Sequence, residues 1–294
     1  MMKVRQEMSR LLIESMVRTI SKSFPLEQAR REAMWISKEL PQSQWINASK
    51  KRSQLVPLQY ILGTQPFGKL DLMCKPGVLI PRLDTEEWVL ESASLLQHVQ
   101  IDKIIDYCTG SGCIGLGYAS ELVKVGRIDM IDYKNDAIKL STDNSIRNEV
   151  DLNIPVSIKE GNLLQGFLPM DPVIADPARN NILVSNPPYI PEGDLHGPEV
   201  EPSVSKYEPA DALLGDLEFY EALCDKIINP FPSFKGFIFE LGYFSQAKLV
   251  SELLNRNEWT IGIRNDSSGN LRNVIGWRKH SEFKVLEGMI NKCL

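Results

Sequence analysis

The sequence has few of the residues from which metal centres and disulfide frameworks are built. It holds three histidines and five cysteines in 294 residues, and the cysteines are scattered without a C-x-x-C pair. This pattern argues against a zinc site and a disulfide framework, and it favours a reducing compartment. No apolar run is long enough to span a bilayer. We therefore expect neither a bound metal nor a membrane association.

Repeats and low-complexity tracts are also missing, and the composition is that of a globular chain, 43% hydrophobic and 24% charged. The net charge of −5 is uneven, because residues 1–60 contain eleven Lys or Arg against five Glu. A charge of +6 there leaves −11 on the remainder. An acidic body argues against stable nucleic-acid binding. The basic part suits a local contact with RNA or an acidic partner, or is simply a solvated helical surface.

The N-terminal part shows helical patterns. The apolar residues of its first segment recur at helical spacing: Met8, Leu11, Leu12, Met16 and Ile20. This basic helix suits either a mitochondrial import peptide or the first helix of a mature domain. A second helix is expected between Pro25 and Pro41, and a third over 45–53. We predict a small helical domain over 1–58. A β-hairpin linker follows over 59–83, with its turn near Pro76-Gly77.

From residue 84 onward, strand patterns alternate with helix patterns. The expected strands are 103–107, 127–132, 156–159, 182–185 and 237–241. The expected helices are 85–97, 114–124, 136–148 and 217–229. This alternation predicts an α/β domain with a mostly parallel, doubly wound sheet. A helix over 245–256 and two short strands, 259–263 and 273–278, are expected to complete it.

A strand, a glycine-rich turn and a helix meet in IIDYCTGSGCIG, residues 104–115. Ligands of such folds bind at the carboxyl ends of the strands, where glycines let the backbone approach them. Asp132 ends the next strand about twenty residues on, where an acidic side chain can bind both hydroxyls of a ribose. The segment predicts a site for an adenosine-bearing cofactor. Because Gly110–Gly115 also fits G-x-G-x-x-G, a dinucleotide stays open as an alternative, as does a tight turn without a ligand.

The fourth expected strand ends in ILVSNPPYIP, residues 182–191. Prolines fix φ and donate no backbone N–H, so Asn186-Pro187-Pro188-Tyr189 is a stiff corner that offers an amide, free carbonyls and an aromatic ring. The corner lies at the same sheet edge as the glycine turn. An amide facing a cofactor with a positive sulfonium suits methyl transfer to a planar nitrogen. Asp106, just before the turn, suits orientation of the turn and of a cationic ligand.

Several stretches together resemble the peptide-chain-release-factor glutamine methyltransferases, above all their fungal mitochondrial members. The matching segments are PLQYILGTQPFG (57–68), PGVLIPRLDTEEWV (76–89), DYCTGSGCIG (106–115), VSNPPYIP (184–191), YEPADALLGD (207–216) and FELG (239–242). NPPY alone also occurs in amino-group DNA methyltransferases, but LIPR-x-[DE]-T-E beside a helical domain is more specific. The resemblance implies a seven-stranded, Rossmann-like methyltransferase domain over 84–294, behind the helical domain and linker.

The resemblance also implies the chemistry. S-adenosylmethionine is the expected cofactor, and S-adenosylhomocysteine is the product. The expected substrate is the side-chain amide of the glutamine in the Gly-Gly-Gln motif of a release factor, whose methylation supports translation termination. A glutamine of a ribosomal protein is the first alternative. An amino-group DNA methyltransferase and an inactive cofactor-binding module are less favoured, because of the acidic catalytic half and the intact Asn186–Tyr189 corner.

Cofactor-binding roles follow from the same resemblance. The implied contacts with the methionine part are Cys108, Thr109, Gly110, Ser111 and Gly112. Asp132 would bind the ribose, and Asn162 and Leu163 would flank the adenine. Two residues depart from the family pattern, since Cys108 replaces a glycine and Asn162 an aspartate. A cysteine is tolerated at position 108 if its φ is negative, because the turn acts through its backbone. Asn162 can still accept from the adenine amino group. We therefore expect weakened or retuned cofactor binding rather than its loss.

For the substrate side, the resemblance implies Asn186, Pro187, Pro188 and Tyr189, with Asn186 also touching the cofactor. Asn186, Pro187 and Tyr189 are the expected catalytic residues. The side chain of Asn186 and the carbonyl of Pro187 would accept the two N–H bonds of the amide, while Tyr189 packs on the glutamine. Asn186→Ala is expected to abolish transfer.

Other residues have structural or open assignments. Thr85 and Glu86 suit the start of a helix, with Thr85 bordering the cofactor as the alternative. Arg82 suits a tie between the linker and the catalytic domain, and Glu240 suits either the lining of the pocket or its rim. We expect a monomer that meets its protein substrate through the helical domain, with Lys50, Lys51 and Arg52 as candidate contacts. Mitochondria are the expected location, with the cytoplasm as the alternative.

Overall fold

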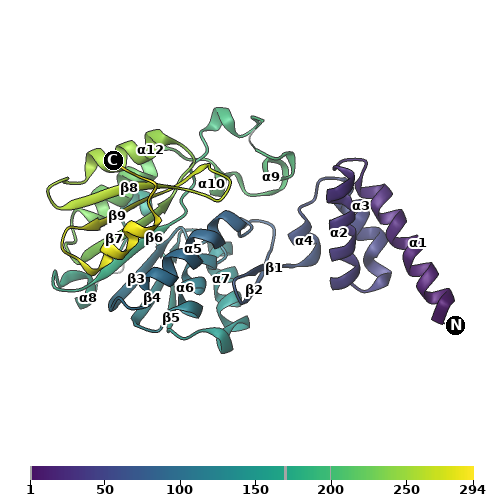
Figure 1. Ribbon diagram of the computed structural model, residues 1–294, viewed down its shortest axis with the longest axis horizontal. Helices are drawn as coiled ribbons and strands as arrows, with labels where there is room; N and C mark the ends of the chain where they lie inside the picture. Colours follow the sequence, from purple (N-terminus) through teal and green to yellow (C-terminus); the bar gives the residue numbers. More distant parts are fainter. Residues whose placement is uncertain (1, 169–170, 199) are drawn as a thin grey trace.

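The computed structural model describes residues 2–168, 171–198 and 200–294, and it shows a small helical body joined to a larger α/β body (Figure 1). The helical body contains α1 (Met2–Ile20), α2 (Leu26–Glu39), α3 (Trp45–Ser53) and α4 (Leu58–Leu62). Its own apolar cluster consists of Met16, Ile20, Ala29, Ala33, Ile36, Trp45, Ala48 and Leu58. None of the described helices is both long enough and apolar enough to cross a membrane.

Helix α1 buries only part of the face that its spacing predicts. Met16 and Ile20 are fully buried, whereas Met8 and Leu11 are 55% and 57% exposed. Met8 and Leu11 are exposed because the helix extends beyond the neighbours that cover its C-terminal half (Figure 1).

Arg52 also differs from its expected role at the surface. Its guanidinium is buried and bonds both carboxylate oxygens of Glu32, at 2.7 and 2.9 Å. It also lies over the ring of Phe24, 3.6 Å from the centroid. A buried, paired arginine cannot dock a partner, so the expectation for Arg52 is wrong, whereas Lys50 and Lys51 are exposed.

The linker contains the hairpin of β1 (Thr64–Phe67) and β2 (Leu70–Met73). Its turn is Gly68-Lys69, with φ of +56° at Gly68, and not Pro76-Gly77. A two-residue connection with a glycine first is a favoured hairpin turn, which explains the difference. Asn144 of α7 (Asn135–Arg147) and Asn148, which directly follows that helix, accept bonds from the backbone N–H groups of Met73 and Asp71. The hairpin is therefore fixed to the α/β body. The boundaries 1–58, 59–83 and 84–294 remain our proposal for the domains.

The α/β body is built on one mixed sheet, in the order β10-β8-β9-β7-β6-β3-β4-β5. The strands are β3 (Ile101–Tyr107), β4 (Val125–Asp132), β5 (Val156–Glu160), β6 (Asn181–Ser185), β7 (Phe234–Glu240), β8 (Trp259–Asn265), β9 (Leu271–Arg278) and β10 (Lys292–Cys293). Strands β3 to β7 pair in parallel, and β8, β9 and β10 pair antiparallel. The predicted fold class is confirmed. The described sheet has eight strands rather than seven, because it includes the two-residue strand β10.

Helices cover both faces of the sheet (Figure 1). Besides α7 they are α5 (Leu83–Leu96), α6 (Cys113–Glu121), α8 (Pro172–Ala175), α9 (Pro202–Tyr207), α10 (Ala210–Leu213), α11 (Leu217–Ala222) with a π-helical continuation (Leu223–Ile228), and α12 (Phe244–Leu253). Short 3-10 helices are Gln42–Gln44, Glu149–Asp151, Leu163–Gln165, Glu192–Asp194 and Glu282–Met289. On β6, Ile182 and Val184 join one apolar cluster and Leu183 the other, as alternation in a strand with two covered faces requires.

Candidate cofactor and substrate site

The glycine turn leaves the carboxyl end of β3 and enters α6. Asp106, fully buried before the turn, accepts hydrogen bonds from the hydroxyl of Thr109 and from the N–H of Gly115, the latter at 2.9 Å. Burial raises the pKa of Asp106 to about 7. Gly115 must be glycine, because a Cβ there would lie 2.6 Å from Met130. Asp106 thus orients the turn as expected, although it does not border the cavity found among the described residues.

The backbone of Cys108 contradicts the sequence-based expectation. Its φ is +60°, in the left-handed region, and Gly110 and Gly112 follow with +55° and +86°. A glycine adopts this conformation without cost, whereas a residue with a Cβ is strained there. The condition under which a cysteine was expected to be tolerated here, a negative φ, is therefore not met. Burial raises the pKa of the Cys108 thiol well above its usual value, so the thiol is neutral.

Asp132 supports the same turn from the end of β4. One carboxylate oxygen accepts from the N–H of Gly110 at 2.9 Å, and the other from the N–H of Lys134 at 3.0 Å. The side chain borders the cavity although the residue is only 8% exposed. Burial raises the pKa of Asp132. The carboxylate is thus held by backbone donors beside the turn, in the place expected of a ribose-binding group.

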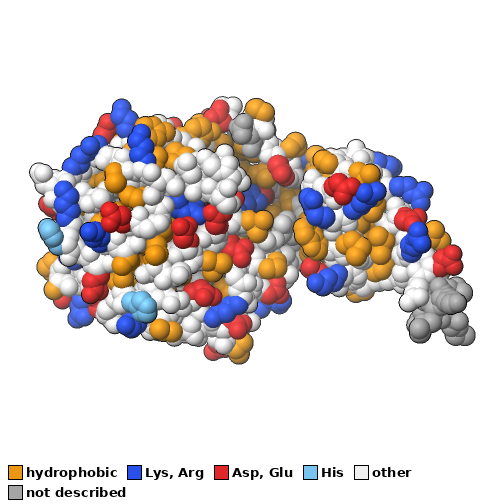
Figure 2. Space-filling view, viewed as in Figure 1, with side chains coloured by type: hydrophobic (Ala, Val, Ile, Leu, Met, Phe, Trp, Pro, Cys, Tyr) orange, Lys and Arg blue, Asp and Glu red, His pale blue; other side chains and the backbone are white. Residues whose placement is uncertain are grey.

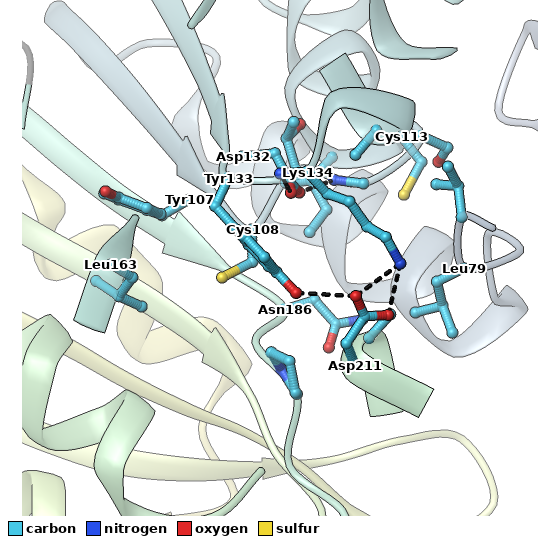
Figure 3. A pocket seen from close by; sticks show the side chains of 18 of the residues that line it. Leu79, Tyr107, Cys108, Cys113, Asp132, Tyr133, Lys134, Leu163, Asn186 and Asp211 are labelled. Carbon is cyan, nitrogen blue, oxygen red and sulfur yellow. Dashed lines mark hydrogen bonds and ion pairs between the residues drawn. The ribbon is translucent and has the colours of Figure 1, made fainter. Parts of the chain in front are cut away.

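A cavity of about 290 Å³ opens in front of the turn (Figure 3). Most of the predicted residues line it: Cys108, Thr109, Gly110, Ser111, Asp132, Asn162, Leu163, Asn186 and Pro188. Within the described chain, Gly112, Pro187 and Tyr189 are not among the lining residues. Gly112 instead packs towards Met130 and Ser141, and the ring of Tyr189 lies against Gly242.

The cavity also has walls that the sequence interpretation did not assign. These are contributed by the linker (Gly77, Val78, Leu79, Ile80, Pro81), by the segment after Asp132 (Tyr133, Lys134), and by Asp211, Ala212 and Phe219. The motif stretches 76–89 and 207–216 contain many of them, so the resemblance covered these residues but implied no role for them. Tyr133 and Lys134 directly follow Asp132, and this adjacency was the available clue for them. Two residues with an expected role line the cavity as well: Arg82, expected to tie the linker, and Thr85, expected as a helix start or a cofactor neighbour.

The residues present fit an adenosine-bearing ligand. A backbone turn with two glycines, a carboxylate and an amide converge on a largely apolar space. Asn162 uses its side-chain oxygen to accept from the N–H of Leu164 at 2.9 Å, which caps the 3-10 helix Leu163–Gln165. Asn162 therefore shapes the cavity floor as well as lining it.

The Asn186 corner leaves β6 beside this cavity, and Figure 3 shows Asn186 near Asp211. Its rigidity comes from more than the two prolines. The N–H of Ile190 donates to Leu213 at 2.9 Å, and the side-chain amide of Gln246 donates to the carbonyl of Tyr189 at 3.0 Å. Burial raises the pKa of the Tyr189 hydroxyl, so this ring is neutral.

Two buried carboxylates connect the surrounding segments. Glu208 accepts from the N–H of Ile80 at 3.0 Å and from Arg82 at 2.7 Å. The structure thereby shows Arg82 tying the linker to the catalytic body, as expected, although Arg82 borders the cavity too.

Glu240, at the end of β7, is the second buried carboxylate. It accepts from the hydroxyl of Thr85 at 2.7 Å and from the indole N–H of Trp88 at 2.8 Å. Because Glu240 is 1% exposed and is not among the residues that line the described cavity, it is neither a rim charge nor a wall of the pocket. Burial raises its pKa.

Comparisons with known proteins agree with this geometry. The family model "Methyltransferase small domain" matches residues 89–197. The catalytic domain of hMettl16, solved with an RNA hairpin, has a similar fold, with a TM-score of 0.54 and 15% identity over 79% of this chain and 80% of that chain. The fold and the site define a methyltransferase of the Rossmann-like class, and the dinucleotide alternative is set aside.

Two relatives place the chain more closely. The mitochondrial MRF1 N(5)-glutamine methyltransferase MTQ1 of Saccharomyces cerevisiae is 36% identical over 89% of this chain and 83% of its own length. A release factor glutamine methyltransferase of Fusobacterium nucleatum is 38% identical over 81% of this chain and 64% of its own length. The chain belongs to the release factor glutamine methyltransferase family.

Proposed function

We propose that this enzyme transfers a methyl group from S-adenosylmethionine to the side-chain amide nitrogen of the glutamine in the Gly-Gly-Gln motif of a release factor, in support of translation termination. The observation that carries the proposal is the position of Asn186, which borders the cavity formed by the glycine turn and Asp132. The names of the relatives, which act on MRF1 or on a release factor, support the substrate.

The cofactor would lie along the turn from Cys108 to Gly112, with its ribose on Asp132 and its adenine between Asn162 and Leu163. When bound, it supplies a methyl group on a positive sulfonium. Gly112 is buried under the turn, so we assign it to the shape of the turn and the other residues to direct contact.

The substrate amide needs help because its nitrogen lone pair is delocalised into the carbonyl. In our proposal, the side-chain oxygen of Asn186 and the backbone carbonyl of Pro187 accept its two N–H bonds and aim the nitrogen at the methyl group. The new C–N bond forms as the S–C bond breaks, and the nitrogen then releases one proton to water. Acceptors in these positions stabilise positive charge on nitrogen, so they act most strongly in the transition state. Pro188 and Tyr189 would complete the substrate side.

The helical body is the proposed docking surface for the protein substrate, with a monomeric enzyme and no stable nucleic-acid complex. Figure 2 shows Lys and Arg side chains beside hydrophobic ones on its visible face. Lys50 and Lys51 remain candidate contacts, and Arg52 is withdrawn because it is buried. The mitochondrial relative in yeast supports mitochondria as the location. A ribosomal protein substrate remains the second candidate, since its glutamine amide has the same chemistry.

The proposal is tested by incubating the protein with labelled S-adenosylmethionine and with candidate release factors or ribosomal proteins, followed by mass spectrometry of the labelled peptide. We expect the label on the Gly-Gly-Gln glutamine, and none on a factor whose glutamine is replaced by asparagine. Asn186→Ala should abolish transfer while S-adenosylhomocysteine still binds within about threefold of wild type. Near-normal turnover in that variant would refute the role of Asn186, and label on another protein alone would refute the substrate.

A further inference from the structure

Three side chains meet across the mouth of the cavity (Figure 3). The hydroxyl of Tyr133 donates to Asp211 at 2.9 Å, and the ammonium of Lys134 lies 2.7 and 2.6 Å from its two carboxylate oxygens. All three residues line the cavity. Tyr133 and Lys134 come directly after Asp132, whereas Asp211 comes from α10, 78 residues beyond Tyr133. The contact therefore joins the proposed ribose-binding loop to a distant segment.

That segment, Pro202–Asp216, contains α9 and α10 and is called here the α9–α10 segment. Besides Asp211, the described contacts hold it at Tyr207, whose hydroxyl donates to the carbonyl of Gln54 at 2.9 Å, at Glu208, and from Leu213 to Asp216. Glu208 is bonded to the linker at Ile80 and Arg82. Leu213 and Gly215 are bonded to Ile190 of the asparagine corner, at 2.9 and 3.1 Å. Asp211 and Ala212 lie between these attachments, where they border the cavity.

The electrostatics of the contact suit a group that opens and closes. Partial burial opposes ionisation of Asp211, but the bonds from Lys134 and Tyr133 outweigh it and hold the pKa of Asp211 below its usual value. The Lys134 and Asp211 side chains are 30% and 41% exposed. Ion pairs exposed to that extent contribute little to global stability and form and break readily. Loss of the Lys134–Asp211 pair is therefore expected to change the structure near the cavity and not the stability of the whole chain.

We propose that Asp211, held by Tyr133 and Lys134, is the latch that keeps residues 209–212 of the α9–α10 segment over the cavity and sets the rate at which S-adenosylmethionine enters and S-adenosylhomocysteine leaves. The inference rests on the proposed cofactor. Breaking the latch removes two polar contacts and leaves the attachments at Glu208 and Ile190 in place. Residues 209–212, which lie between these attachments, then move away from the cavity more often, so entry and exit accelerate together and the equilibrium affinity changes less than either rate.

The test measures association and dissociation rates of S-adenosylhomocysteine by stopped-flow displacement in wild type, Asp211→Asn and Tyr133→Phe. The matched control is Asp143→Asn, which breaks another exposed Lys–Asp pair, with Lys75 at 2.8 Å, away from the lining of the cavity. We expect Asp211→Asn to raise both rates about three- to tenfold and Tyr133→Phe to raise them about two- to threefold, the scale of exposed polar pairs. Asp143→Asn should match wild type.

Unchanged rates in Asp211→Asn, or equal increases in Asp143→Asn, would overturn the latch alone. A higher dissociation rate with an unchanged association rate would also overturn it, since that result describes a simple ligand contact. A wild-type chain that binds no S-adenosylhomocysteine would instead overturn the proposed cofactor, and the latch with it. The two failures are thus distinguishable from a single data set.

Discussion

The left-handed backbone at Cys108 makes a stability prediction that reverses the usual order of alanine and glycine. We compare Cys108→Ala with Cys108→Gly. Both variants remove the thiol, so the lost packing of the sulfur is common to them. They differ in the Cβ atom, which only the alanine keeps at a φ of +60°.

The difference in stability between the two variants is the balance of two opposing contributions. A Cβ in the left-handed region costs about 1–2 kcal/mol. Glycine loses about 0.4–1 kcal/mol through the greater freedom of its unfolded chain. The balance leaves Cys108→Gly more stable than Cys108→Ala by about 0.5–1 kcal/mol. For a chain of this size the difference corresponds to about 1–3 °C in Tm.

The assay is urea unfolding of both variants followed by circular dichroism, with thermal melts as a second measurement. Cys224 provides the matched control, because it is fully buried within the helical segment Leu223–Ile228. There Cys224→Ala should be more stable than Cys224→Gly by about 1 kcal/mol. If alanine is also the more stable residue at position 108, Cys108 is not strained and the conformational argument is refuted.

Two further predictions concern buried charges. Arg52→Met should destabilise the helical body by about 3–5 kcal/mol in denaturant unfolding, because it leaves the buried Glu32 without its arginine partner. The control, Arg10→Met at the exposed Arg10–Glu14 pair, should cost under about 1 kcal/mol. Equal effects of the two changes would contradict the assignment of Arg52. Since burial raises the pKa of Asp106 to about 7, above an unfolded value of about 4, the wild type should lose stability as pH rises from about 4 to 7. In unfolding titrations, Asp106→Asn should not show this loss, so its stability relative to wild type should increase with pH. A difference in stability that does not change with pH would contradict the raised pKa of Asp106.

The local parts of this fold could be predicted because they depend on local physics. Helix α3 begins at Trp45 and ends at Ser53 as expected, since apolar spacing and flanking residues set such limits. The turn from Cys108 to Gly112 was visible for a similar reason, because a backbone that approaches a ligand needs glycines. Strand β10 was missed because two residues carry no periodicity.

The remaining features depend on contacts between distant residues. Arg52 occurs in a basic run that is typical of an exposed helix, and its partner Glu32 lies 20 residues away. The Tyr133–Asp211 contact spans 78 residues. The φ of Cys108 is set by the path of the turn, which its residue type does not reveal. In each case the sequence offered suitable side chains, and the tertiary fold decided which of them meet.

The two buried carboxylates, Glu208 and Glu240, belong to the matching segments although neither lines the cavity found among the described residues. Glu208, from YEPADALLGD, bonds Ile80 and Arg82 of the LIPR segment. Glu240, from FELG, bonds Thr85 and Trp88, a few residues further along the same segment. The lining residues Ile80, Arg82 and Thr85 of this cavity wall are thus each bonded to one of these carboxylates. Because breaking a buried hydrogen-bonded charge is costly, this wall has one position relative to the Asn186 corner. In the proposed reaction, the asparagine corner aims the amide, and Glu208 and Glu240 keep the opposite wall in register with it.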